Sequence, residues 1–204
     1  MADARILPAR TAGSTATENP SNFTREILET VILTLLIFFA IHFSIQPYFV
    51  DGPSMQPNLH TGDLVMVNLL SYDFGTPQRG DVIVFHPPDE PKLQYVKRII
   101  GIPGDTVTVT PTAVYVDNVK LSEPYIYPLA AGQDESPVAI PAQHLDTGQY
   151  FVLGDNRDNS RDSRYFPTPV TREMIIGKVE LVAWPFSAIE WMRSYSSVFT
   201  SVHQ

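Results

Sequence analysis

Two residues of this 204-residue chain are candidates for nucleophilic chemistry. Ser54 lies in the segment Gly-Pro-Ser-Met-Gln-Pro at 52–57, where glycine and proline on both sides favour a tight turn that presents the hydroxyl. A serine hydroxyl is a weak nucleophile and needs a positioned base. Lys97 is a candidate base, because a desolvated lysine loses affinity for its proton. Taken alone, the two residues are better explained as an ordinary turn serine and a surface lysine.

The segment around Lys97 has the alternation of a β-strand. In Tyr-Val-Lys-Arg-Ile-Ile-Gly at 95–101, Tyr95, Lys97 and Ile99 would share one face of the strand. Arg98 would then lie on the opposite face with the neighbouring apolar residues. We therefore expect one of the two adjacent cations to point toward an apolar face, where burial would lower the pKa of a lysine.

A second polar segment is unusual in its charge pattern. In Gly-Asp-Asn-Arg-Asp-Asn-Ser-Arg-Asp-Ser-Arg at 154–164, three acids alternate closely with three arginines. One interpretation is a self-satisfied loop, in which aspartates accept backbone N–H bonds and pair with arginines. The other is a calcium loop, because Asp158, Ser160 and Asp162 have the spacing of its first ligands. That interpretation lacks the sixth-position glycine and the closing glutamate.

Other reactive residues give weaker signals. The chain has no cysteine, which excludes a thiol nucleophile, thiolate metal sites and disulfides. Its five histidines have no metal-ligand spacing, and no Gly-x-Ser-x-Gly elbow is present. A Ser-His-Asp site is not excluded by these counts. With 14 basic and 22 acidic residues, a net charge of −8, the chain is a poor candidate for binding nucleic acid.

An apolar segment precedes these motifs. The 21 residues at 30–50 carry no charge, and as a helix they would span about 30 Å, enough to cross a bilayer. We predict a disordered tail at 1–25 and a transmembrane helix at 26–49, ended by Pro47. Arg10 and Arg25 precede the helix, which favours a cytoplasmic N-terminus and an extracytoplasmic domain at 50–204. A buried helix and a cleaved signal peptide are the weaker alternatives.

The region after the helix is predicted to be mainly β. Fifteen of the 18 prolines lie there, which argues against long helices. Short strand-like runs occur between turn signals, with about 106–148 forming a small β extension. The predicted strands are 64–69, 81–85, 94–100, 106–109, 113–116, 150–153 and 177–183. The predicted fold class is therefore an extracytoplasmic domain of short, strongly bent antiparallel sheets with one N-terminal transmembrane helix.

Taken together, the segments at 52–57, 95–101 and 154–164 resemble the motifs of bacterial type I signal peptidases. A weaker fourth match is Arg-Gly-Asp-Val-Ile-Val-Phe at 79–85. Their order, after an N-terminal membrane helix, also agrees. The resemblance implies a membrane-bound serine endopeptidase at the plasma membrane. Its substrates would be secretory preproteins, cut after small-x-small sites through an acyl-enzyme. No cofactor or metal is implied, and the lipid bilayer is the second expected partner.

The resemblance also assigns roles to residues. Ser54 would be the nucleophile and Lys97 the general base. In the third motif, Ser160 would hydrogen-bond and orient the lysine amine, Asp162 and Arg164 would form a supporting ion pair, and Asp155 would be structural. Val50, Met55 and Tyr95 are candidate walls of the substrate pocket.

Two departures from the family pattern concern the nucleophile turn. Gly52 has no hydroxyl where some members supply a second oxyanion donor. Asn58 replaces the usual threonine and is expected to affect only the local turn.

Two other classes of protein share parts of this pattern. Self-cleaving repressors have a similar β-fold and dyad, but they carry an N-terminal DNA-binding domain where this chain has an apolar helix. A membrane-anchored non-enzymatic or calcium-binding module would use the Asp/Arg loop as a scaffold. Cleavage of a preprotein, and its loss with Ser54 or Lys97 replaced, separates the peptidase from both.

Overall fold

The computed structural model of the chain describes residues 20–126 and 138–202. The chain divides into two units, residues 1–41 and 42–204. Helix α1 (Pro20–Ser44) accounts for the described part of the first unit and the first residues of the second. Among the described residues, no helix has both the length and the apolar character that crossing a bilayer requires.

The bounds of α1 differ from the predicted ones at both ends. The helix begins at Pro20, whose fixed φ suits a first helical turn, so residues 20–25 are helical and do not belong to the expected tail. An Arg25–Glu29 pair at 2.6 Å supports this first part. The rest of the predicted tail, 1–19, lies outside the described residues.

At its other end, α1 stops at Ser44, and residues 45–49 form a strand that contains Pro47. Proline is tolerated there because this strand lies at the edge of the sheet.

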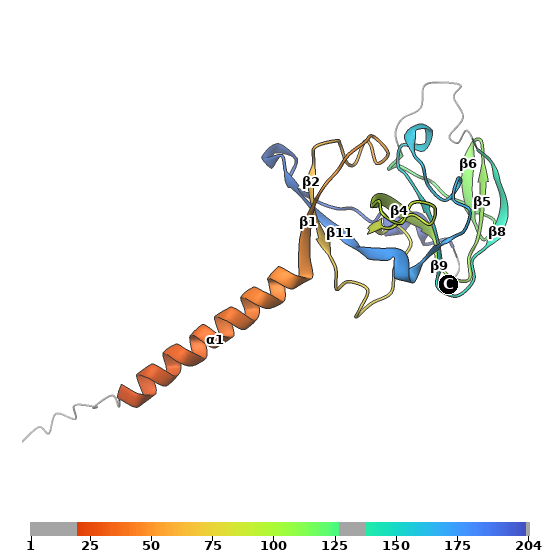
Figure 1. Cartoon of the computed structure of the whole chain (residues 1–204). Helices are drawn as coiled ribbons and strands as arrows, with labels where there is room; N and C mark the ends of the chain where they lie inside the picture. Colours follow the sequence, from red (N-terminus) through yellow and green to blue (C-terminus); the bar gives the residue numbers. More distant parts are fainter. Residues whose placement is uncertain (1–19, 127–137, 203–204) are drawn as a thin grey trace, which may run out of the picture. The chain divides into compact units, whose positions relative to one another are not determined.

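The second unit is mainly β, as predicted, and all its strand pairs are antiparallel. The larger sheet has the order β1-β2-β11-β3-β4-β9-β10, with β12 added to β11 (Figure 1). Its strands are β1 (Ile45–Phe49), β2 (Leu64–Asn68), β3 (Val82–Phe85), β4 (Tyr95–Gly101), β9 (Gln149–Leu153), β10 (Val170–Thr171), β11 (Ile175–Trp184) and β12 (Glu190–Trp191). The seven predicted strands all overlap observed ones.

A smaller sheet corresponds to the segment expected to be a β extension. It has the order β7-β6-β5-β8 and consists of β5 (Thr106–Thr110), β6 (Ala113–Val116), β7 (Val119–Lys120) and β8 (Ile140–His144). Its apolar face packs with β9 and the C-terminal turn η4 (Ser196–Phe199) around Val107, Phe151 and Phe199. This core anchors the extension beside the strand that leads into the Asp/Arg loop.

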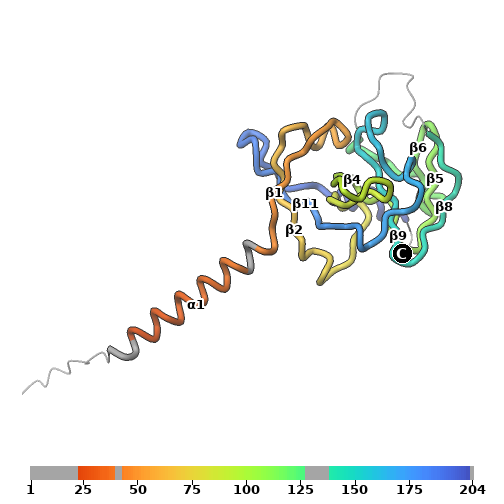
Figure 2. Tube along the Cα trace, viewed as in Figure 1, coloured from red at the N-terminus to blue at the C-terminus, as the bar shows by residue number. Residues whose placement is uncertain are grey.

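Strand β11 gives the larger sheet its curvature. It pairs with β2 on one edge and β3 on the other, although these strands lie far earlier in the sequence, as the blue segment of the trace shows (Figure 2). Its register with β2 shifts between Val179 and Leu181 and again between Val182 and Trp184. Such bulges bend and twist a strand. The bent sheet brings β2, β3 and β4 around one pocket.

Candidate active site

Ser54 lies in the loop that joins β1 to β2, and buried side chains of this loop pack it against the core. Gly52 has a φ of +98°, a conformation that favours glycine and turns the chain just before the serine. Met55 and Leu59 are fully buried, and the Leu59 N–H donates to the Met55 carbonyl at 2.9 Å. Ser54 is therefore presented on a rigid turn whose apolar side belongs to the core.

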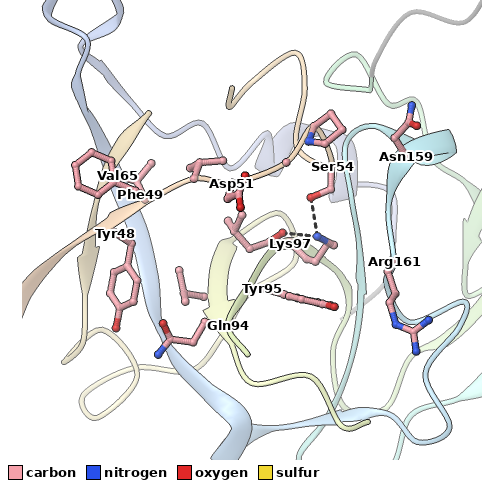
Figure 3. A pocket seen from close by; sticks show the side chains of 15 residues that line it. Tyr48, Phe49, Asp51, Ser54, Val65, Gln94, Tyr95, Lys97, Asn159 and Arg161 are labelled. Carbon is pink, nitrogen blue, oxygen red and sulfur yellow. Dashed lines mark hydrogen bonds between the residues drawn. The ribbon is translucent and has the colours of Figure 1, made fainter. Parts of the chain in front are cut away.

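Lys97 approaches Ser54 from the middle of β4. Its Nζ lies 2.8 Å from Ser54 Oγ and 2.8 Å from the Val96 carbonyl oxygen (Figure 3). The residue is only 3% exposed. Burial lowers the pKa of Lys97 from 10.5 to about 8, against the opposing effect of Asp162 and Asp155 and with a smaller lowering effect from Arg164. A neutral amine at this position would accept the serine proton directly.

The alternation expected along β4 explains only part of the observed burial. The prediction assigned one of the two adjacent cations to an apolar face, yet both Lys97 and Arg98 are buried. The Arg98 guanidinium donates to both Asp155 oxygens at 2.9 and 2.8 Å, and it lies 4.5 Å from the centroid of the Tyr125 ring. Asp155 is therefore held in a buried ion pair with Arg98, the residue that follows Lys97.

The rest of the Asp/Arg loop forms a second buried ion pair. Arg164 donates to the two Asp162 oxygens at 2.8 and 2.9 Å, and both side chains are fully buried. Asp162 also accepts the Gly154 N–H at 3.0 Å. Both Asp162 oxygens accept hydrogen bonds within the loop, and Asp158 is exposed, which is the arrangement of the self-satisfied loop.

Ser160 differs from its expected role. It is buried, but its hydroxyl has no hydrogen-bond partner among the described residues. The expected bond to the Lys97 amine is therefore not formed. Ser160 instead lies close against Gly154, and a Cβ at Gly154 would also come within 2.5 Å of the Ser54 carbonyl oxygen. Glycine at 154 thus permits the loop to approach the nucleophile turn.

The nucleophile turn is tied to this loop through Ser54 itself and through Asn58. The Asn156 N–H donates to the Ser54 carbonyl at 3.0 Å. The Asn58 amide donates to Asp155 at 2.8 Å and to the Tyr125 carbonyl at 2.7 Å. Asn58 was expected to affect only its own turn. In the structure it joins the turn, the loop and the segment after β7.

A buried ion pair links the extension to the same loop. Arg157 donates to Glu123 at 2.6 and 3.1 Å, and both side chains are almost fully buried. Arg157 Nε also donates to the Gly154 carbonyl at 3.0 Å, and the Arg157 carbonyl accepts from Arg164 at 2.7 Å. Sequence reasoning did not find Glu123, because its partner lies 34 residues away.

A pocket of about 330 Å³ opens beside the Ser54–Lys97 pair. Val50 and Tyr95, two of the three residues named from the sequence as candidate pocket walls, line it together with Tyr48, Val65, Val84 and Val96. Met55 does not. It is fully buried beneath the turn with Leu59 and Val65, because the inner side of the turn packs on the sheet. Asn159 and Arg161 border the pocket on the far side of Ser54 from Tyr48 and Phe49 (Figure 3).

Among residues 20–126 and 138–202, no strand pairs with one edge of β4 beside this pocket. Tyr95, Val96 and Lys97 pair with β3 on one side, whereas pairing with β9 on the other side begins only at Arg98. Within the described part of the chain, the backbone of residues 95–97 therefore offers an unpaired strand edge next to Ser54. An extended peptide can add to such an edge as a further strand.

The chain is similar to known proteins of one family. The family described as "Signal peptidase, peptidase S26" matches residues 24–184. Signal peptidase IB of Staphylococcus aureus (strain MRSA252) is 37% identical over 183 residues, covering 82% of this chain and 94% of the relative. Signal peptidase I T of Bacillus subtilis (strain 168) is 36% identical over 166 residues, covering 77% and 83%.

A solved structure of a signal peptidase I from Enterococcus faecalis V583 is also similar. It has 32% identity and a TM-score of 0.44, and the match covers 52% of this chain and 97% of that one.

The family match and the curated relatives identify the chain as a peptidase, a hydrolase of peptide bonds. The chain belongs to the S26 signal peptidase family, and the family supports cleavage of signal peptides as its function.

Proposed function

We propose that this chain removes signal peptides from secretory preproteins with Ser54 as nucleophile and Lys97 as general base. The observation that carries the proposal is the 2.8 Å distance between Lys97 Nζ and Ser54 Oγ, with the amine buried. Neutral Lys97 accepts the hydroxyl proton while Ser54 Oγ attacks the scissile carbonyl. Lys97 then donates that proton to the leaving amine, and an acyl-enzyme remains on Ser54.

Hydrolysis of the acyl-enzyme uses the same base. Lys97, neutral again after proton donation, takes a proton from water, which attacks the ester carbonyl. The bond from that carbon to Ser54 Oγ then breaks, Lys97 returns the proton to Oγ, and the signal peptide is released as the acid. The developing oxyanion requires preorganised donors. The Ser54 backbone N–H is available, because it makes no hydrogen bond among the described residues. Gly52 brings no hydroxyl to this point, so the backbone N–H is the donor that we assign.

Substrate selection follows from the pocket. The signal-peptide strand adds to the free edge of β4 at residues 95–97. Its side chains next to the cut then meet the apolar wall formed by Val50, Val65, Val84 and Val96. Only small side chains fit between such a strand and this wall, so cleavage follows small-x-small sites by exclusion of larger residues.

We also infer that the peptidase domain works at a lipid surface, with the apolar part of α1, which ends at Ser44, as the single transmembrane segment and the N-terminus in the cytoplasm. From residue 30 onward this helix carries no charge, and the large apolar side chains described on it are exposed. Phe49 ends the strand that follows, and further exposed apolar residues lie at the β11–β12 end of the same sheet: Trp184, Phe186, Ile189 and Trp191. Aromatic side chains prefer the membrane–water interface. Protease protection in sealed vesicles tests the orientation.

The test of the peptidase proposal uses the full chain in detergent micelles and a preprotein with an Ala-x-Ala site. Wild type should cleave after the second alanine, whereas Ser54→Ala and Lys97→Met should lose at least about 10³-fold in kcat/KM. Mass spectrometry at mildly acidic pH should detect an acyl adduct on the peptide that contains Ser54. Cleavage by Ser54→Ala, or loss of activity in His60→Ala or His86→Ala, would refute the dyad.

A further inference from the structure

The pocket beside Ser54 has two chemically different ends. Tyr48, Phe49 and Val65 lie on one side of the Ser54–Lys97 pair, and Asn159 and Arg161 lie on the other (Figure 3). Arg161 brings a permanent positive charge to that second end. The acidic lining residue, Asp51, is drawn between Phe49 and Ser54, away from the guanidinium. The positive charge and the apolar wall therefore face different parts of a bound peptide.

The Arg161 guanidinium is held in place but is not saturated. One Nη2 hydrogen binds Asp89, in the connection between β3 and β4. This is the single hydrogen bond of its five N–H donors among the described residues, and the Arg161 side chain is 53% exposed against 17% for Asp89. Asp89 thus fixes the direction of the guanidinium while other donors stay available at the pocket. Free arginine donors of this kind match a carboxylate in a bidentate manner.

The orientation of the bound substrate determines which of its residues lie at the polar end of the pocket. The inference rests on the proposed function, in which the apolar residues before the cut lie along the valine-lined wall. The chain must then continue past Ser54 toward Asn159 and Arg161, so the leaving group occupies the polar end. We propose that Arg161 is a specificity-determining residue that favours preproteins with an aspartate or glutamate in the first two positions after the cut, and disfavours those with a lysine there.

The experiment compares kcat/KM for preproteins that are identical except for one residue. The full-length enzyme in detergent receives substrates with Glu, Gln or Lys at the first or second position after the cut, and a control substrate with Glu at the tenth position. Because an exposed ion pair is worth little, the expected preference of wild type for Glu over Lys is about fivefold. The preference should fall in high salt. Glu at the tenth position should behave as Gln does.

Two variants and one matched control test the role of the charge. Arg161→Gln should bring the ratio of Glu to Lys substrates to about one, and Arg161→Glu should invert it. Asp158→Asn changes an exposed charge in the same loop that does not line the pocket, so it should keep the wild-type ratio. Circular dichroism shows whether each variant is folded.

The possible failures are distinguishable. The inference is overturned if Arg161→Gln keeps the wild-type ratio of kcat/KM for the Glu and Lys substrates. It is also overturned if this variant loses kcat/KM uniformly for all substrates. If wild type cleaves every substrate equally, the specificity assignment fails and the peptidase proposal stands. If wild type cleaves none of them, the proposed function itself fails.

Discussion

Replacing Lys97 with methionine should make the protein more stable at neutral pH while abolishing cleavage. The structure holds this amine in a site where burial lowers its pKa from 10.5 to about 8. At pH 7 the lysine is mostly protonated, so folding carries a charge into a desolvated site at a free-energy cost. Methionine has a similar length and no charge, and it removes that cost.

The size of the effect follows from the two pKa values. The unfolded state binds more protons than the folded state between about pH 8 and pH 10.5, so stability rises with pH in this window. Below pH 8 the full cost of about 3 kcal/mol applies, and at pH 10 less than about 1 kcal/mol remains. Lys97→Met has no such dependence, so its stability advantage should shrink by about 2.5 kcal/mol between pH 7 and pH 10.

Urea unfolding of the full chain in detergent, at pH 7 and pH 10, measures this difference. Other groups that titrate in the interval are common to wild type and variant and cancel in the comparison. Lys120→Met is the matched control, because Lys120 is exposed. Its replacement should not alter the difference in unfolding free energy between pH 7 and pH 10. A Lys97→Met protein that is less stable than wild type at pH 7, or an advantage that is the same at both pH values, would refute the argument that the amine is strained by burial.

Two further predictions concern activity and the link to the extension. Since only the neutral amine of Lys97 acts as base, kcat/KM should rise about tenfold per pH unit below its midpoint near pH 8, and a maximum at acidic pH would contradict a lysine base. Glu123→Gln leaves Arg157 buried without its counter-charge and should lower the unfolding free energy by about 3 kcal/mol. The matched Glu190→Gln change, at an exposed pair with Arg193, should cost less than about 1 kcal/mol, and equal losses would contradict the buried-pair argument.

The features that the sequence predicted well are those encoded within a few residues. Each predicted strand is a short β-branched or aromatic run between glycine or proline turns, and local chemistry suffices to define it. The Asp162–Arg164 pair was implied by the resemblance to signal peptidases, and the local alternation of acids and arginines alone indicated only a loop of Asp/Arg pairs. Alternation along β4 predicted only that one of the two adjacent cations would face apolar residues, whereas both Lys97 and Arg98 are buried.

The errors come from competition that a local pattern does not contain. The apolar run predicts a helix to residue 49, but pairing of β1 with β2 takes residues 45–49 into the sheet. Met55 has the composition of a pocket wall, yet the core beneath the turn buries it completely. Ser160 is close to Gly154, but Lys97 Nζ is bonded to Ser54 and Val96. In each case tertiary packing decides between two locally acceptable outcomes.

The residues that the sequence did not reveal all act across long separations. Asn58 connects to Asp155 over 97 positions, and Arg157 to Glu123 over 34. These bonds explain why a small extension is integrated into a catalytic domain. A lysine whose pKa must stay near 8 cannot tolerate mobile charges nearby, because each one would shift that pKa. Each buried carboxylate of the loop is paired with an arginine, and this pairing fixes the charges near Lys97. The extension supplies Glu123, which pairs with Arg157, and Arg157 in turn donates a hydrogen bond to the Gly154 carbonyl.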